Sequence, residues 1–303
     1  MKMLKLPKKV YFKSGSMNVA FRELNEVYHL KRAFLVSDPD LYRSGIVSQV
    51  DRWLCKQGLR TAEYFSIGHP PSFANIRGAL PKLLEFEPDV LVGIGGGAAM
   101  SAAKAMWALY ETPELELSEA VEHPERIRTG EKAKLALAAT SFGSGAQNSP
   151  YAVLRDDEGK TRVLNSFCLL PELSVTDAQF TGSLSSGQVK ACSLNTLSQA
   201  IRAFTADGCC EYTQGLLLEA VQAVLRHWKD AEDGSPAARE RLYNAAALAG
   251  AAYGNVPFIP DQEALPYPTD AEKVAAGGRI QQLAESLGFS GTQALWDACE
   301  ALR

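Results

Sequence analysis

The sequence feature that most constrains the fold is DVLVGIGGGAAMSAAKAMW, at residues 89–107. An apolar run at 90–94 predicts a buried parallel strand, the three glycines predict a tight turn, and the alanine-rich stretch predicts a helix. Glycines let a phosphate approach the backbone, and the free N–H groups of a helix's first turn attract an anion. Since GGG is not the GxGxxG fingerprint, the segment fits either a pyrophosphate-binding turn or an ordinary strand-to-helix turn.

Length and composition indicate an ordinary protein of two domains. The chain has 303 residues, 46% of them hydrophobic and 22% charged, which is enough for two domains at roughly 150 residues each. A net charge of -4 gives no reason to expect nucleic acid or an acidic membrane as partner. No apolar run approaches the roughly 20 residues of a membrane span. Residues 1–9 are basic without a following apolar core, so we expect no signal peptide and a cytoplasmic protein.

The six cysteines show no CxxC spacing, which argues against a zinc cluster or a disulfide framework. We expect reduced and mostly buried thiols. Cys209 and Cys210 are adjacent, which is compatible with a redox site or with chance.

Strand patterns fill the first part of the chain. Besides the strand at 90–94, apolar runs predict strands at 9–12, 33–37, 61–66, 133–139 and 173–176, and residues 151–155 and 161–164 flank a DDEG turn that predicts a hairpin. Between them we expect one helix over 41–57, a helix capped by Ser72 that runs to 85, and a polar surface connection over 111–131.

From about Thr181 only helical periodicity remains, and helices are expected at 185–205, 211–230, 236–253, 271–287 and 292–302, with a proline-rich joint at 256–268. The sequence therefore predicts an α/β Rossmann-like domain over residues 1–180, followed by an all-α domain over residues 181–303.

Two further polar features lie at predicted strand ends. Asp38 follows the strand at 33–37, where a carboxylate can accept from a ribose 2′-OH and repel a 2′-phosphate. The alternative is that Asp38 only caps the next helix. The loop TSFGSG at 140–145 offers small hydroxyl and glycine residues that suit a second wall of a phosphate or nicotinamide pocket.

Several linked motifs resemble one family in the same order. They are KKVYFKSGS, FLVSDP, EFEPDVLVGIGGGAAMSAAKAMWALYETPE, GEKAKLALAATSFGSGAQNSPYAVLRDDEGK and LLPELSVTD. They resemble the iron-dependent (group III) alcohol dehydrogenases, most closely the C-terminal alcohol dehydrogenase half of the bifunctional aldehyde-alcohol dehydrogenases. The resemblance implies a truncated dehydroquinate synthase-like fold. It also implies an iron or zinc ion between the two domains that polarises the alcohol oxygen while hydride passes to NAD.

By position, the resemblance implies ten NAD contacts: Asp38, Gly95, Gly96, Gly97, Ala98, Ser101, Thr140, Ser141, Ser144 and Arg162. Three of them depart from the family pattern. Ala98 stands where the family has Ser, Ser101 where it has Asp, and Arg162 where it has Lys. Loss of that Asp removes a polar contact near the nicotinamide end, while the phosphate cradle survives.

The metal positions of the family are changed. The resemblance places its first two ligands, an Asp and a His four residues apart, at Asn195 and Gln199. Two further family histidines belong to a segment that this chain skips as it passes from NAAALAGAAYGNV into PFIPDQEALPYPTDAEK. None of His29, His69, His123 and His227 stands at a matching position, and we expect His29 and His227 on helical segments. Because Fe²⁺ and Zn²⁺ bind imidazole, thiolate or carboxylate donors, we expect neither metal here.

Two functions follow. The favoured one is a nucleotide-binding relative with absent or strongly reduced dehydrogenase activity, which self-associates or binds the aldehyde dehydrogenase of its pathway. The alternative is an active, metal-independent NAD(P)-dependent oxidoreductase of a small alcohol or aldehyde, with the carbonyl polarised by Arg162, Tyr151, Tyr253 or the amides of Asn195 and Gln199.

Overall fold

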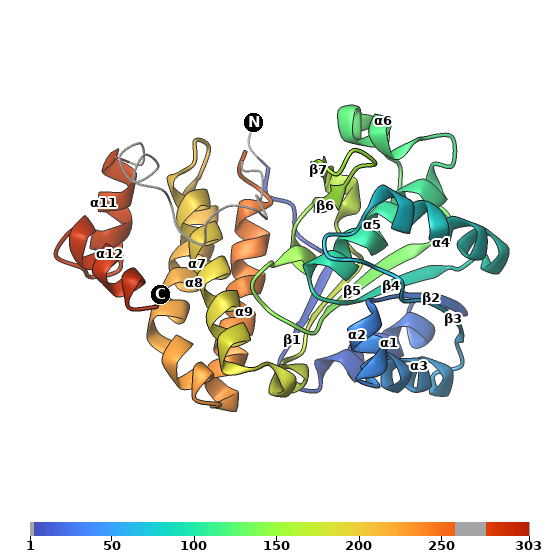
Figure 1. Cartoon of the computed structure of the whole chain (residues 1–303), viewed down its shortest axis with the longest axis horizontal. Coiled ribbons are helices and arrows are strands. Elements are labelled where there is room, and N and C mark those ends of the chain that lie inside the picture. The colour runs from blue at the N-terminus through green and yellow to red at the C-terminus, as the bar shows by residue number, and fades with distance from the viewer. Residues whose placement is uncertain (1–2, 258–276, 303) are drawn as a thin grey trace. The chain divides into compact units, whose positions relative to one another are not determined.

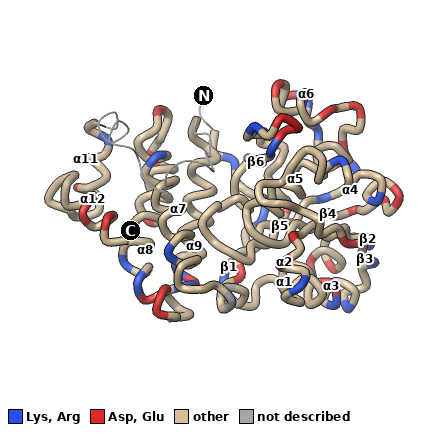
Figure 2. Tube along the Cα trace, in the orientation of Figure 1, with Lys and Arg blue, Asp and Glu red and all other residues tan. Residues whose placement is uncertain are grey.

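The computed structural model describes residues 3–257 and 277–302, except the side chains of Thr181 and Ser183 (Figure 1). Its internal contacts form two compact units. The α/β unit contains Pro7–Thr140 and Pro150–Asp177, and the helical unit contains Met1–Leu6, Ser141–Ser149 and Ala178–Arg303. The predicted boundary at residues 180/181 stays a prediction. Acidic and basic residues are interspersed along both units (Figure 2).

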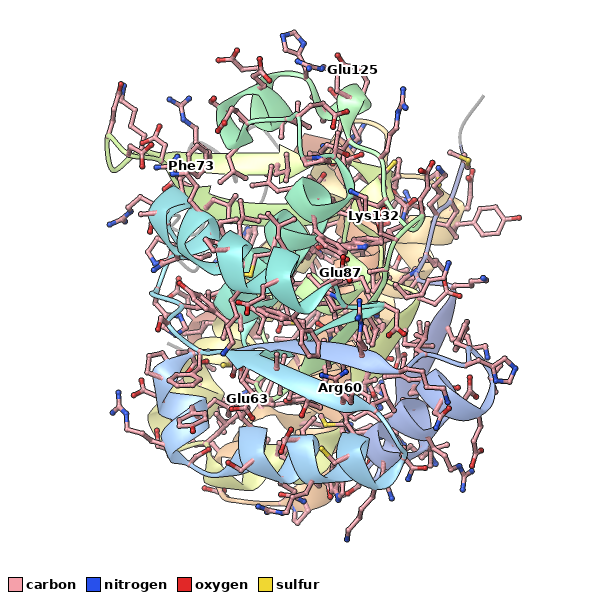
Figure 3. The ribbon with its side chains drawn as sticks, turned by 90° about the vertical axis from the view of Figure 1, so that its right-hand side faces the viewer. Arg60, Glu63, Phe73, Glu87, Glu125 and Lys132 are labelled. Carbon is pink, nitrogen blue, oxygen red and sulfur yellow. The ribbon has the colours of Figure 1, made fainter. Side chains whose placement is uncertain are left out.

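The α/β unit is built on a parallel sheet of six strands in the order β1-β8-β5-β4-β2-β3. Their bounds are β1 Lys9–Phe12, β2 Arg32–Val36, β3 Arg60–Tyr64, β4 Val90–Gly95, β5 Lys134–Ala139 and β8 Leu173–Thr176. The strands β4 and β8 are buried throughout, whereas no residue of the edge strand β3 is buried. Figure 3 labels Arg60 and Glu63 on β3. The chain returns from β3 past β2 to β4, so the strand order reverses between β2 and β4.

The helices of this unit are α1 Ser16–Glu26, α2 Pro39–Arg43, α3 Ile46–Lys56, α4 Phe73–Phe86, α5 Gly97–Glu111 and α6 Leu117–Glu122. The prediction of one helix over 41–57 is wrong, because Gly45 adopts a φ of 84° and ends α2 before α3 begins. The predicted cap of α4 is confirmed: Ser72 Oγ accepts from Asn75 N–H at 3.1 Å.

Small residues let α5 pack closely on the sheet. Its residues from Ala98 to Tyr110 are all buried. A Cβ at Gly93 of β4 would lie 2.7 Å from Ala103 Cβ and 2.8 Å from Leu137 Cδ2. The alanine-rich sequence after the glycines therefore fixes the distance between the helix and the central strand.

The stretch over 111–131 is more than a surface connection, which corrects the prediction. It contains α6 and a 3-10 turn, Pro124–Arg126. Its Leu115, Ala120 and Ile127 are buried in one cluster with Leu164 and Leu169. The stretch packs on the antiparallel hairpin of β6 Tyr151–Arg155 and β7 Thr161–Asn165, whose position the sequence predicted. The sequence prediction missed this packing because charged residues interrupt the short apolar pattern of the stretch.

The helical unit contains α7 Ser186–Thr205, α8 Glu211–Glu232, α9 Pro236–Tyr253, α11 Gly277–Ser286 and α12 Thr292–Glu300. The apolar stripe predicted on α7 is buried at Val189, Leu197, Ile201 and Phe204, while Cys192 is half-buried. Most of the predicted joint at 256–268, and the start of the helix predicted over 271–287, lie outside the described residues.

A pair of glycines lets α9 touch the loop at 141–149. A Cβ on Gly250 would overlap the carbonyl oxygen of Gly145 and lie 2.7 Å from its Cα. Gly145 has a φ of 57°, and its own Cβ would lie 2.6 Å from Gly250 Cα. Both positions therefore require glycine.

We expect Gly250→Ala to destabilise the protein by about 1–3 kcal/mol, because the new methyl group meets backbone rather than a movable side chain. In an unconstrained helix the same change stabilises by about 1 kcal/mol. Gly215→Ala, on α8 with nothing within 4 Å of its Cβ position, is the matched control. Urea unfolding should show opposite signs for the two variants, and a stabilising Gly250→Ala would contradict this packing.

Two smaller predictions are corrected by the structure. The six cysteines are free as expected, but only Cys299 is buried, and Cys55 and Cys168 are exposed. His29 is not helical, since it follows α1 with a φ of 56°, whereas His227 lies on α8 as predicted.

Candidate active site

Asp38 and the glycine turn, both predicted to contact the nucleotide, meet where the strand order of the α/β unit reverses. In parallel α/β sheets, ligands bind in the crevice outside the carboxyl ends of the strands at such a point. Asp38 follows β2 and the glycine turn follows β4, and the two strands are direct neighbours. The structure therefore brings together two features that are about 60 residues apart in sequence.

Asp38 serves as the cap of α2, one of its two sequence interpretations. Its Oδ1 accepts from Leu41 N–H at 2.8 Å, and the residue is 7% exposed. Its Oδ2 lies 3.3 Å from the position a Cβ would take at Gly95. The cap thus fixes this carboxylate directly against the glycine turn, which leaves the ribose interpretation open.

The glycine turn presents uncapped backbone N–H groups at the start of α5. Gly96 is the N-cap residue and supplies no side-chain acceptor. The N–H groups of Gly97, Ala98 and the residue after it therefore have no intrahelical partner. Gly95 has a φ of 146°, and a Cβ there would lie 2.8 Å from Ala99 Cβ. This arrangement suits an anion such as a pyrophosphate.

Two side chains of α5 hold the neighbouring strand β6. Ser101 Oγ accepts from Val153 N–H at 3.1 Å, and Lys104 Nζ donates to Tyr151 O at 2.8 Å. Lys104 is fully buried, and burial lowers its pKa to about 7. Sequence reasoning missed Lys104, although a single charged residue within the apolar run after the glycines was a visible signal.

The loop at 140–145 is divided between the units along the chain, with Thr140 in the α/β unit and residues 141–145 in the helical unit. Thr140 N–H donates to Gly95 O at 3.0 Å, so the end of β5 is tied to the glycine turn within the α/β unit. Ser141 and Ser144 belong to the helical unit and are partly exposed. The Tyr253 hydroxyl donates to Ser144 O, so its proton is already used.

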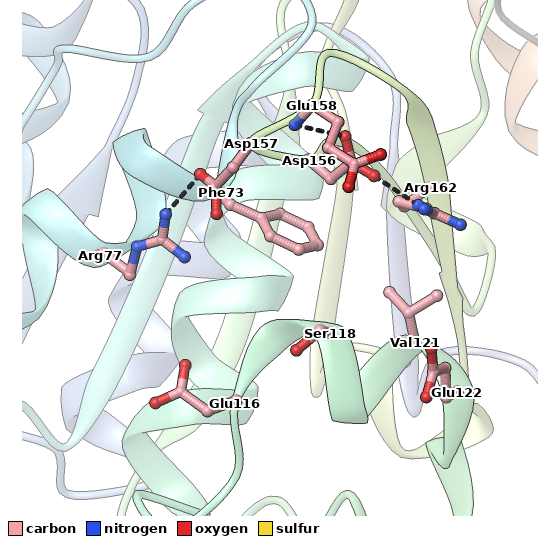
Figure 4. A pocket seen from close by; sticks show the side chains of 10 residues that line it. All are labelled: Phe73, Arg77, Glu116, Ser118, Val121, Glu122, Asp156, Asp157, Glu158 and Arg162. Carbon is pink, nitrogen blue, oxygen red and sulfur yellow. Dashed lines mark hydrogen bonds and ion pairs between the residues drawn. The ribbon is translucent and has the colours of Figure 1, made fainter.

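Arg162 has partners other than the glycine turn. Its Nε donates to Asp156 Oδ2 at 2.7 Å across the β6–β7 turn, and this bond lowers the pKa of Asp156. Arg162 lines a cavity of about 230 Å³, and none of the other nine predicted contacts is among the lining residues. Figure 4 shows these lining side chains. Its assignment as a cofactor contact stays a prediction.

The two residues that the sequence resemblance places at the family's metal positions form an amide pair on α7. Gln199 Nε2 donates to Asn195 Oδ1 at 2.9 Å, and Asn195 Nδ2 donates to Gly143 O at 3.1 Å. The buried Gln199 Oε1 has no hydrogen-bond partner among the described residues. Cys192, one turn earlier, is the nearby thiol, and burial raises its pKa to about 11. It stays protonated at neutral pH.

These donors do not fit Fe²⁺ or Zn²⁺, which bind carboxylate, neutral imidazole or thiolate. The amides are neutral, and one N–H of each is used on a protein acceptor. Within residues 3–257 and 277–302, no three His, Cys, Asp or Glu side chains lie together so that they could hold an ion. The sequence predicted the missing histidine segment at the junction of residues 256 and 257, and residues 258–276, which follow that junction, lie outside the described ranges.

Comparison with known proteins decides the family. The model of the iron-containing alcohol dehydrogenase family matches residues 7–178, more than half of the chain. The chain belongs to this family. The resemblance and the fold class stated from the sequence are therefore confirmed.

Relatives of this chain include larger proteins. The chain is 32% identical over 264 residues to a bifunctional aldehyde-alcohol dehydrogenase of Escherichia coli. The matched region covers 83% of this chain and 29% of that protein. It therefore spans under a third of such relatives. An NADPH-dependent butanol dehydrogenase of Clostridium saccharobutylicum is 25% identical over 252 residues, covering 82% of this chain and 64% of that protein.

Solved structures share the fold. An iron-containing alcohol dehydrogenase from Thermococcus thioreducens superposes with a TM-score of 0.88 at 22% identity, covering 99% of this chain and 85% of that one. A sulfoacetaldehyde reductase from Bifidobacterium kashiwanohense, in complex with NAD+, gives 0.83 at 19% identity, with 100% and 85% covered. Among the helices described here, none combines the length and apolarity needed to cross a bilayer.

Proposed function

We propose that this protein binds NAD at the glycine turn and has absent or strongly reduced alcohol dehydrogenase activity, because its family metal positions hold amides. The amide pair of Asn195 and Gln199 carries the proposal. A metal at this place acts as a Lewis acid on a developing alkoxide, a contribution of several kcal/mol. Neutral amides already bonded to one another and to Gly143 offer neither negative charge nor a vacant set of strong donors.

The glycine turn supports the nucleotide half of the proposal. The uncapped N–H groups at the start of α5 would bind the pyrophosphate, and Asp38 would accept from the ribose. A carboxylate at this place repels a 2′-phosphate, so NAD is favoured over NADP. When bound, the cofactor supplies the hydride acceptor or donor of family chemistry.

Two of the groups considered for metal-free polarisation of a carbonyl already have protein partners. Tyr253 donates its hydroxyl to Ser144 O, and Arg162 pairs with Asp156. The buried Gln199 Oε1 is an acceptor, whereas a substrate carbonyl needs a donor, and the second N–H of each amide is a neutral donor, weaker than a charged one. These contacts favour the weakly active or inactive protein over the metal-independent oxidoreductase.

Metal content and turnover test the proposal together. After purification and dialysis, the chain should hold far less than one equivalent of iron or zinc, while calorimetry shows NAD or NADH binding. Ethanol oxidation and acetaldehyde reduction should be at least about 100-fold slower than in a metal-loaded relative, with no gain from added Fe²⁺ or Zn²⁺, since about 1.4 kcal/mol is a tenfold change in rate.

A double variant, Asn195→Asp with Gln199→His, gives the matched control. It restores two charged or imidazole donors on one helix face and should raise the affinity for Zn²⁺. One tightly bound metal per native chain with metal-dependent turnover would overturn the proposal. Turnover that no chelator removes would favour the metal-independent oxidoreductase instead. Self-association and binding of a pathway aldehyde dehydrogenase stay proposals, to be checked by the solution mass of the chain with and without that enzyme.

A further inference from the structure

The proposed function leaves the adjacent cysteines of the sequence unexplained. Cys209 and Cys210 lie in the turn between α7 and α8, and Cys210 is the N-cap residue of α8, in extended backbone conformation. Both residues are partly exposed. Their position in a turn, rather than within the helix, leaves them accessible to a small reagent.

Both sulfurs contact the same side chain. The hydroxyl oxygen of Thr213 lies 3.4 Å from Cys209 Sγ and 3.7 Å from Cys210 Sγ. It also accepts from Cys210 N–H at 2.9 Å. The hydroxyl also donates to Cys210 O at 2.9 Å, so it is fixed in the turn with both sulfurs close to its oxygen.

The surroundings of Cys210 favour its thiolate. The backbone N–H and the hydroxyl of Thr213 lower the pKa of the Cys210 thiol. The start of the 22-residue helix α8 adds the partial positive charge of a helix N-terminus.

The turn itself is held in place from α11. Arg279 donates through Nη1 to Thr205 O and through Nη2 to Asp207 Oδ1, each at 2.9 Å. These two bonds bracket the residues that lead into the dithiol, so the thiols sit on an ordered turn.

We propose that Cys209 and Cys210 form a peroxide-sensitive dithiol, in which Cys210 is the attacking and Cys209 the resolving residue. The Cys210 thiolate attacks one oxygen of a hydroperoxide; the O–O bond breaks, the other oxygen leaves as an alcohol or water after taking a proton, and Cys210 becomes a sulfenic acid. The Cys209 thiol then attacks that sulfur, water leaves, and a disulfide forms. The two thiols lose two electrons in total, and the peroxide gains them.

The disulfide should be easily reversed. Adjacent Cα atoms lie about 3.8 Å apart, below the usual range of about 4.4–6.8 Å for disulfides. A disulfide outside that range is strained and more readily reduced, as in labile or regulatory disulfides. A reversible response, rather than a permanent crosslink, follows from the spacing.

The test uses the reduced 303-residue chain and hydrogen peroxide at low molar excess. Intact mass should fall by two hydrogens, and peptide mapping should locate the bond between Cys209 and Cys210, with recovery on adding dithiothreitol. In the Cys209→Ser variant, oxidation should stop at a sulfenic acid on Cys210, which dimedone should trap. Cys210→Ser should react at least about tenfold more slowly. Serine is a favoured N-cap, so this variant keeps the start of α8.

Two internal controls make the test decisive. Cys55 is a more exposed thiol without an adjacent cysteine, and it should react after Cys210. Thr213→Val keeps the shape of the side chain but removes the shared hydroxyl. The pH at which alkylation of Cys210 by iodoacetamide reaches half its maximal rate should therefore rise. Oxidation that begins at Cys55 or Cys168, or an unchanged rate in Cys210→Ser, would overturn the proposal.

Discussion

A Gly95→Ala substitution should weaken NAD binding at least about tenfold, because it moves the backbone N–H groups that would hold the pyrophosphate. The added Cβ would lie 2.8 Å from Ala99 Cβ and 3.3 Å from Asp38 Oδ2, in a residue whose φ is 146°. Relief of these contacts has to move the start of α5 or the Asp38 carboxylate. Each hydrogen bond to a charged group is worth about 1.5–3 kcal/mol, so the loss of one gives roughly a 10- to 100-fold effect.

The matched control is Gly45→Ala, which also strains a backbone with a positive φ, here 84°, but has nothing within 4 Å of its Cβ position. Isothermal calorimetry of both variants, with circular dichroism to show that each is folded, separates a local effect from general destabilisation. Equal NAD affinity in Gly95→Ala and Gly45→Ala would show that the nucleotide does not use this turn.

The second large effect is a rise in stability with pH that depends on Lys104. Burial lowers the pKa of Lys104 from 10.5 to about 7. At pH values between these two pKa values, the unfolded chain binds a proton on Lys104 that the folded chain does not, so the free energy of unfolding rises with pH. The cost of burying Lys104 is largest below about pH 7, where the folded chain has to carry it charged. From pH 7 to 9 the contribution of Lys104 should amount to about 2–3 kcal/mol.

Urea unfolding at pH 7, 8 and 9 measures this contribution as the difference between the wild type and Lys104→Met. Lys56→Met, at the exposed end of α3, should keep the wild-type slope. The range stops at pH 9 because burial raises the pKa of Cys192 to about 11, which lowers stability at higher pH. Parallel curves for the wild type and Lys104→Met would mean that Lys104 is not buried as the structure has it.

The inner strands β2, β4, β5 and β8 were predictable because they are short, largely apolar runs bounded by turns, and burial on both faces leaves that pattern clear. The break at Gly45 was missed, since the hydrophobic periodicity continues across it while the backbone does not. The packing of 111–131 was missed because Leu115 and Ile127 are spaced for contact with a distant hairpin, not for a regular face.

The candidate site was predictable only in part. Asp38 and the glycine turn stand at strand ends, and parallel strands bring such ends to one edge of the sheet. Arg162 bonds to Asp156 across the predicted hairpin turn, whereas the bond from Tyr253 to Ser144 and the contact of Gly145 with Gly250 join segments far apart in sequence. No local sequence pattern indicates such long-range contacts, so they could not be predicted from the sequence.

The helical unit is assembled from three separate stretches of chain, one of which is Ser141–Ser149. Expression of residues 181–303 alone would therefore leave out the loop that covers Gly250 and accepts from Asn195. Dissection of this protein by a single cut would give a fragment with an exposed helix face. Domain exchange with relatives has to graft that nine-residue loop together with the helices.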